Sequence, residues 1–211
     1  VTLTGYLASV YLYSLQKFFL QTRPNFTKRR KSIIRVQIPV NLRSIFQTNT
    51  LRNFALFVTP EIAPNLGAYT FEEILTTVHH YMQLETDKRQ IRRIITRNVG
   101  SEKNPLIRII PLAIKIQVLR IVFGNSGPLL YSGVLTNLGA VRIPEEYNAY
   151  IQGFRFLAPP PDPRFKINAA MISYNDRLIF NFGSLVESND FEREFFSFLV
   201  GEQIHVKILS H

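Results

Sequence analysis

The stretch IRVQIPVNLR, residues 34–43, is the part of this 211-residue sequence whose pattern most directly indicates a fold. Apolar residues at positions 34, 36, 38 and 40 alternate with Arg35, Gln37 and Pro39, which is the period of a strand buried on one face. Pro39 has no backbone donor, so it places the end of this strand near a sheet edge. The sequence therefore predicts a half-buried strand over 34–40.

Helices are predicted on both sides of this strand. Residues 2–19 follow the helical period, and a second short strand is predicted over 53–58. Thr70 and Glu73 stand three residues apart and form the capping box that begins a long helix. This helix is expected to run to about residue 97.

A further helix is predicted from about Pro105 to Phe123. Its apolar sequence is interrupted by the cations Arg108, Lys115 and Arg120. A bilayer span needs about 20 apolar residues with few charges. We therefore interpret this segment as a buried helix whose cations reach the surface along their aliphatic stems, and not as a membrane span.

Beyond residue 124 the predicted elements are mostly short strands. They cover 130–136, 152–158, 167–174 and 178–182, with a possible last strand over 204–208. A final helix is expected from Asn189 to Phe198, closed by Gly201. The whole pattern predicts an α/β fold in the form of an α+β two-layer sandwich, with a mixed sheet and helices mainly on one face.

Composition and charge exclude several classes of protein. The absence of cysteine excludes disulfide scaffolds, zinc fingers and cysteine nucleophiles. Apolar residues make up 46% and charged residues 19%, which excludes an intrinsically disordered chain. The net charge of +10 belongs to the first part: residues 1–125 hold 18 Lys and Arg against 6 Asp and Glu. Such a surface suits nucleic acid, anionic lipid, a phosphorylated cofactor or an acidic partner.

The sequence carries no pattern typical of a metal site. His79 and His80 are adjacent on the predicted helix, so their side chains point about 100° apart and do not chelate one ion together. Acidic residues do not cluster as a calcium or magnesium site requires. We therefore expect no metal, and a structural or surface role for both histidines.

Three segments, taken in their order and spacing, resemble the coenzyme-A-dependent acyltransferase superfamily. They are PVNLR at 39–43, YSGVLTNLG at 131–139 and ISYNDRLIFNF at 172–182. This superfamily includes chloramphenicol acetyltransferase, dihydrolipoyl acyltransferase cores, condensation domains of peptide synthetases and alcohol acetyltransferases. The resemblance covers nearly the whole chain, but only as a C-terminal lobe. It implies that 1–211 form a single chloramphenicol acetyltransferase-like lobe, the C-terminal half of a larger two-lobed protein.

The resemblance also implies roles for individual residues. Thr136 corresponds to a hydroxyl that helps to stabilise the tetrahedral oxyanion, which makes it the one candidate catalytic residue. The remaining motif residues are assigned to structure: Asn41, Arg43, Asn137, Gly139, Asp176 and Arg177. Two interpretations without chemistry stay open, namely a strand end closed by Asn137 and Gly139 and a hairpin turn over 174–177.

The function implied is the transfer of an acyl group from a coenzyme A or phosphopantetheine thioester to an alcohol or amine. The family's general base is the histidine of an HHxxxDG motif, and Leu84 and Glu85 stand where Asp and Gly belong after His79 and His80. The isolated chain is therefore expected to be inactive without an N-terminal lobe. We also expect cytoplasmic localisation, and self-association through apolar surface that the other lobe would cover.

Two other hypotheses stay open, the first from the charge of the chain and the second from the same resemblance. The first is a non-catalytic basic module that binds nucleic acid or an acidic protein; nucleic acid is the less favoured partner because the basic runs lack an RNA-recognition aromatic pattern. The second is a degenerate structural lobe in a multidomain synthetase. Salt dependence separates phosphate-backbone binding from the others, since it falls steeply between about 50 and 200 mM salt.

Overall fold

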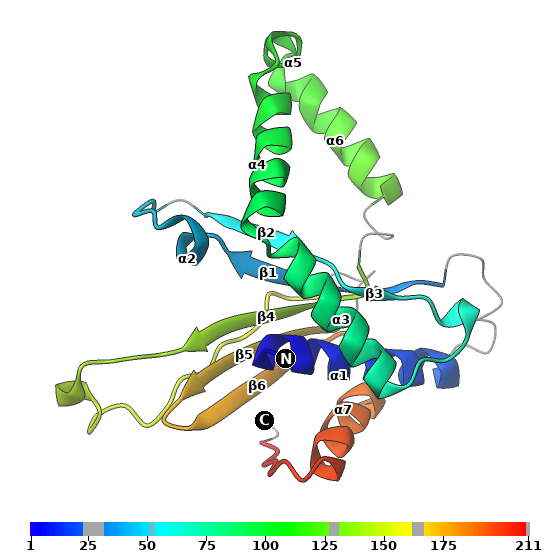
Figure 1. The fold of residues 1–211 in the computed structure, drawn as a ribbon, viewed down its shortest axis with the longest axis vertical. Helices are drawn as coiled ribbons and strands as arrows, with labels where there is room; N and C mark the ends of the chain where they lie inside the picture. The colour runs from blue at the N-terminus through cyan, green and yellow to red at the C-terminus, as the bar shows by residue number, and fades with distance from the viewer. Residues whose placement is uncertain (23–31, 52, 127–130, 162–166, 210–211) are drawn as a thin grey trace.

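A computed structural model describes residues 1–211 except 23–31, 52, 127–130, 162–166 and 210–211 (Figure 1). In the described part, six strands form one mixed sheet with the order β2-β1-β4-β5-β6, and β3 pairs with β1. The strands are β1 (Ile34–Asn41), β2 (Ala55–Val58), β3 (Glu61–Ile62), β4 (Gly133–Ala140), β5 (Ile167–Tyr174) and β6 (Arg177–Ser184). β4 is parallel to both of its neighbours, β1 and β5, and the other pairs are antiparallel. The predicted mixed α/β sheet is confirmed.

Three helices cover one face of this sheet: α1 (Leu3–Thr22), α3 (Phe71–Glu85) and α7 (Asp190–Gly201) (Figure 1). The β1 side chains of Ile34, Val36 and Ile38 are fully buried toward them, as the alternation of residues 34–40 predicts. The capping box at the start of α3 is also confirmed, because the Thr70 hydroxyl accepts from the Glu73 amide and the Glu73 carboxylate accepts from the Thr70 amide.

Tyr11 of α1 lies at the centre of the core between helices and sheet. Its side chain is fully buried, its ring meets Phe191 edge to face at 5.0 Å between centroids, and its hydroxyl donates to the Ile167 carbonyl at 3.0 Å. Burial raises the pKa of the Tyr11 phenol. Gly133 lies directly against that hydroxyl, so a Cβ there would overlap it and would also stand 2.8 Å from the Ile167 carbonyl oxygen. This close approach explains why β4 begins with glycine.

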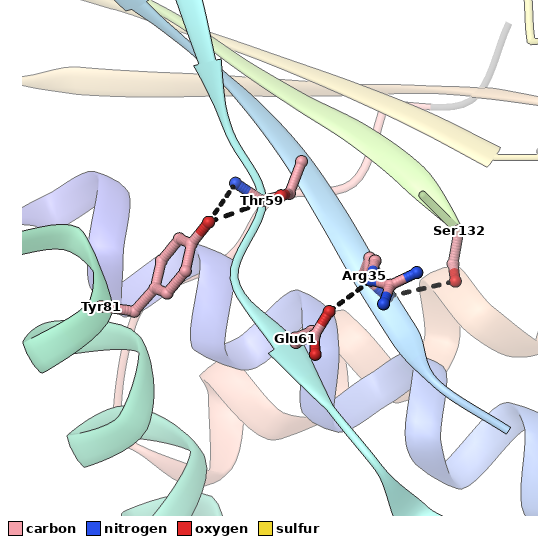
Figure 2. A network of polar contacts seen from close by, with 5 residues as sticks. All are labelled: Arg35, Thr59, Glu61, Tyr81 and Ser132. Atoms are coloured by element: carbon pink, nitrogen blue, oxygen red, sulfur yellow. Dashed lines mark hydrogen bonds and ion pairs between the residues drawn. The ribbon is translucent and has the colours of Figure 1, made fainter. Parts of the chain in front are cut away.

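Polar contacts hold the short strand β3 and the start of β4 against β1 (Figure 2). The Arg35 guanidinium pairs with the Glu61 carboxylate across β1 and β3. The Arg35 amide donates to the Ser132 hydroxyl at 3.2 Å, and the Ser132 amide donates to the Arg35 carbonyl. From the helix layer, the Tyr81 hydroxyl accepts from the Thr59 amide at 3.2 Å. The sheet is thereby fixed at the end where β4 enters it.

The single long helix predicted after Thr70 is wrong, because α3 ends at Glu85. The second helix is α4 (Lys88–Lys103), which passes through Gly100. Asp87 separates the two, and its carboxylate accepts from the backbone amides of Arg89 and Gln90 at the start of α4. An Asp that satisfies such free amides begins a new helix instead of continuing the old one.

Two predicted strands are absent from the described residues. Residues 152–158 form no strand, because their segment contacts the sheet through single carbonyls instead of a ladder. Asn181 donates to the Phe156 carbonyl at 3.1 Å, and Asn168 donates to the Pro159 carbonyl at 3.1 Å. Residues 204–208 form no strand either; they follow Gln203, whose φ of 62° turns the chain at the end of α7.

The helix predicted from Pro105 to Phe123 is in fact two helices, α5 (Pro105–Ile109) and α6 (Leu112–Ser126), and the expectation that it is buried is wrong. Pro111 separates the two because it cannot donate a helical hydrogen bond. The large aliphatic side chains of α6 are exposed, with Leu112 at 70% and Leu119 at 64%. Together with α4 these helices form a projection beyond the β2 side of the sheet, with α5 at its tip (Figure 1). We call residues 88–126 the arm.

The part of the chain that the structure describes contains no helix with both the length and the apolar character to cross a bilayer. A small helix, α2 (Arg43–Phe46), follows β1, and single 3-10 turns occupy Pro64–Leu66 and Glu145–Tyr147.

Candidate functional site

The three motif segments meet at one end of the sheet. β1, β4 and β5 run parallel, with Val36 paired to Gly133 and Thr136 paired to Ala170. Their carboxyl ends therefore lie at the same edge, where Figure 1 shows α2 beyond the end of β1 and the β5–β6 hairpin on the other side of β4. Ligands of α/β sheets bind characteristically outside the carboxyl ends of parallel strands. The structure thus brings together segments that are about 40 to 100 residues apart in the sequence.

A β-bulge shapes the end of β4. Asn137 pairs with Met171, but the next recorded pair is Ala140 with Ser173, so β4 carries one more residue than β5 over this interval. Gly139 adopts a φ of +85°, a conformation that glycine enters without steric cost. Its amide donates to the Asn137 side-chain oxygen at 2.8 Å. Bulges of this kind occur often beside active sites, where they redirect a side chain.

Asn137 also ties the bulge to the helix layer. Its side-chain nitrogen donates to the Thr4 hydroxyl near the start of α1 at 2.9 Å. With one side-chain end on Gly139 and the other on Thr4, the amide has a structural function in this geometry. The carboxamide holds the end of β4 at a fixed position relative to α1.

Thr136 lies on the opposite face. Its neighbour Leu135 is fully buried toward the helices, so strand alternation turns Thr136 away from them. The Thr136 side chain is half-buried, and among the described residues its hydroxyl has no hydrogen-bond partner. Beside it on β5 is Ala170, which is fully buried, so this face of the sheet is also covered there. Thr136 is thus directed away from the helix layer.

The first motif organises the turn after β1. The Asn41 side-chain oxygen accepts from the Arg43 amide at 3.0 Å, and Arg43 donates from Nε to the Thr50 carbonyl at 3.1 Å. Leu42 between them is buried. These contacts fix α2 and the loop after it at the carboxyl end of β1.

The third motif is a two-residue hairpin turn between β5 and β6. Tyr174 pairs with Arg177, and the two central residues Asn175 and Asp176 have φ values of 47° and 57°. Positive φ at both positions is the type I′ geometry that favours Asn and Asp. Asp176 and Arg177 are exposed. Their local geometry needs no chemistry to explain it.

Neither His79 nor His80 accompanies Thr136. His79 and His80 lie on α3, in the helix layer on the other face, with their ring centroids 5.8 Å apart. Within the described residues, no three His, Cys, Asp or Glu side chains are grouped as a metal site requires. Thr136 therefore has a hydroxyl that can donate a hydrogen bond, but neither His79 nor His80 is placed to take a proton beside it.

A pocket that the sequence did not predict opens next to this end of the sheet, and Arg92 is the one cation among the described residues that line it. It encloses about 630 Å³ between α4 and the α2 segment, and its lining consists of Phe46, Thr48, Thr50, Asn53, Phe54, Arg92, Ile95 and Thr96. Lys88 and Arg92 each stand 6.0 Å from the centroid of the Phe46 ring. The available signal was the four-residue spacing of these two cations on one helix face, but nothing in the sequence pairs them with Phe46.

No family model matches this sequence, and no curated protein matches it. Among solved structures, the chain is similar to the epimerization domain from the third module of tyrocidine synthetase B, with a TM-score of 0.51 at 11% sequence identity. The match covers 95% of this chain and 41% of that one, so the chain spans less than half of the length of its structural neighbour. At this identity the likeness concerns the fold alone, which is like that of condensation domains.

Proposed function

We propose that this chain is the C-terminal lobe of an enzyme that transfers an acyl group from a thioester to an alcohol or amine. The observation that carries the proposal is the meeting of the three motifs at the carboxyl ends of β1, β4 and β5, with a free Thr136 hydroxyl among them. The condensation-like fold, matched over 41% of a longer neighbour, supports a second lobe that supplies the general base.

Thr136 is proposed to act on the oxyanion. Attack on a thioester carbonyl places negative charge on its oxygen, and a donor already in position stabilises that charge without reorganising. The β-branched threonine has few rotamers, and the bulge at Asn137–Gly139 fixes the strand beside it. Loss of one such donor typically lowers turnover ~100–1000-fold.

The side of this pocket that carries Arg92, with Lys88 nearby, is the proposed contact for the donor's phosphates. A coenzyme A or phosphopantetheine thioester carries phosphate groups, and Lys88 and Arg92 place two cations beside the aromatic ring of Phe46. The hydroxyls of Thr48, Thr50 and Thr96 add polar groups to the same lining. The positive charges of Lys88 and Arg92 suit the phosphates of such a donor, and the thioester itself supplies the activated acyl group.

The test is Thr136→Val in the longer protein that includes the second lobe. We expect turnover to fall by about 100-fold or more while the thermal unfolding midpoint stays unchanged, and Thr136→Ser to retain most activity because it keeps the hydroxyl. Thr76→Val is the matched control, since Thr76 is exposed on α3. Full activity of a folded Thr136→Val protein would contradict the role.

A further inference from the structure

The arm exposes more aliphatic surface than a solvated helix explains. Its tip and α6 carry large aliphatic side chains that are 39–78% exposed, namely Ile109, Ile110, Leu112, Ile114, Ile116, Val118, Leu119 and Ile121. A contiguous exposed apolar patch marks a site of interaction with a protein or a membrane.

These side chains surround α6 instead of lining one side of it. At about 100° per residue, positions 112, 116 and 119 fall on one side of the helix, whereas 114, 118 and 121 fall on the opposite side. A groove on another protein covers one side of a helix and leaves the other side wet. Immersion in the boundary between lipid headgroups and acyl chains covers both sides.

The arm also accounts for most of the net positive charge of the protein. Residues 88–126 contain nine Lys or Arg and a single acidic residue, Glu102, and the whole chain has a net charge of +10. From Lys103 to Pro144 the sequence has no Asp or Glu. On α4, the side chains of Arg89, Arg92, Arg93 and Arg97 are exposed. Long cationic side chains keep their charge in the headgroup layer while their stems cover apolar surface.

The position of the arm suits contact with a flat surface. Figure 1 shows α5 at the tip of the projection, farther from the sheet than α4 and α6. Ile109 and Leu112, at 78% and 70% exposure, flank this tip. The most exposed aliphatic residues would therefore enter a bilayer surface first.

We propose that the arm binds the surface of anionic lipid bilayers, with the tip and α6 in the interface and the cations of α4 over the headgroups. Apolar burial and attraction to anionic lipid together determine the strength of such binding. This inference does not depend on acyl transfer, so it can hold or fail whatever the role of Thr136.

The experiment is cosedimentation of the full chain with vesicles of phosphatidylcholine alone and with about one third phosphatidylglycerol. Binding is expected to the anionic vesicles, with weaker binding to the neutral ones and a decrease as salt rises. Leu112→Gln with Leu119→Gln should weaken it by about tenfold or more, because two exposed leucines no longer enter lipid. Lys115→Gln should weaken it about fivefold.

The matched control is Leu84→Gln with Leu185→Gln, which removes two exposed leucines outside the arm, 70% and 53% exposed. It should bind like the unmodified chain. The proposal is overturned if the arm and control variants bind equally or if no vesicle binds. It also fails if the longer protein, with its second lobe, does not bind, or if light scattering shows a dimer that the arm variant abolishes. The proposal is likewise overturned if the chain binds duplex DNA but does not bind vesicles.

Discussion

Replacement of Gly133 by alanine should strongly destabilise the fold, because the start of β4 has no room for a methyl group. The added Cβ would overlap the Tyr11 hydroxyl and stand 2.8 Å from the Ile167 carbonyl oxygen. That carbonyl belongs to the backbone of β5, which is paired on both sides, so Tyr11 must move and release its hydrogen bond to Ile167. Overpacking costs about 1–3 kcal/mol. A buried Ile167 carbonyl left without its hydrogen bond from Tyr11 costs about 1–3 kcal/mol more.

The expected loss for Gly133→Ala is therefore on the order of 2–6 kcal/mol, or about 5–20 °C in Tm for a chain of this size. Urea unfolding followed by circular dichroism at 222 nm measures it. Tyr11→Phe alone should cost about 1–2 kcal/mol, because it removes the donor but keeps the buried ring. In the double variant the methyl group meets no hydroxyl, so the combined loss should be smaller than the sum by about 1 kcal/mol.

Gly153→Ala is the control, since a Cβ at Gly153 would have no atom within 4 Å, and its unfolding midpoint should stay close to that of the unmodified chain. The reasoning is refuted if Gly133→Ala unfolds within about 0.5 kcal/mol of the unmodified chain. Strict additivity of the two substitutions would show that the methyl group and the hydroxyl do not compete for the same space.

Two further predictions concern stability. Burial, with the charge of Asp190 as a smaller cause, raises the pKa of the Glu192 carboxyl above its ordinary value. The folded state therefore favours protonated Glu192, and this contribution to stability is lost as pH rises through the folded pKa. Glu192→Gln should raise Tm at pH 7 but not near pH 4. Calorimetry that finds the same Tm difference at both pH values would contradict this. Thr70→Ala breaks the capping box of α3 and should cost about 0.5–2 kcal/mol in urea unfolding, whereas Thr70→Ser should cost little; equal losses for the two would show that the hydroxyl does not cap the helix.

Elements whose signals are local could be predicted from the sequence. The alternation over 34–40 reflects a strand with one buried face, and the Thr70–Glu73 spacing satisfies helix amides within four residues. The Asn-Asp turn at 175–176 likewise depends on the backbone preferences of two residues. In each case the physical cause lies within a few positions of the chain.

The rest depends on partners distant in sequence. Residues 152–158 have strand-like residues, but the Phe156 carbonyl accepts from the Asn181 side chain of β6, and the Pro159 carbonyl just after them accepts from the Asn168 side chain of β5. The apolar character of α6 indicated burial, and only the three-dimensional structure shows it exposed. For the candidate site, the motifs were visible, but their meeting at one edge depends on the strand order β1-β4-β5, which no local pattern encodes.

The parallel pairing of β1 with β4 has a consequence for how the chain folds. Val36 and Gly133 meet across 97 positions of sequence, whereas the β5–β6 hairpin closes over two residues. Loop-closure entropy must be overcome before such a distant pair gains any stabilisation, and folding slows as contacts become less local. The hairpin and α1 can form early. β4 can pair with both of its neighbours only after the long segment between β1 and β4 has closed its loop and placed the two strands side by side. During that interval the unpaired β1 and β5 edges are exposed to other chains, so refolding yield should fall as protein concentration rises.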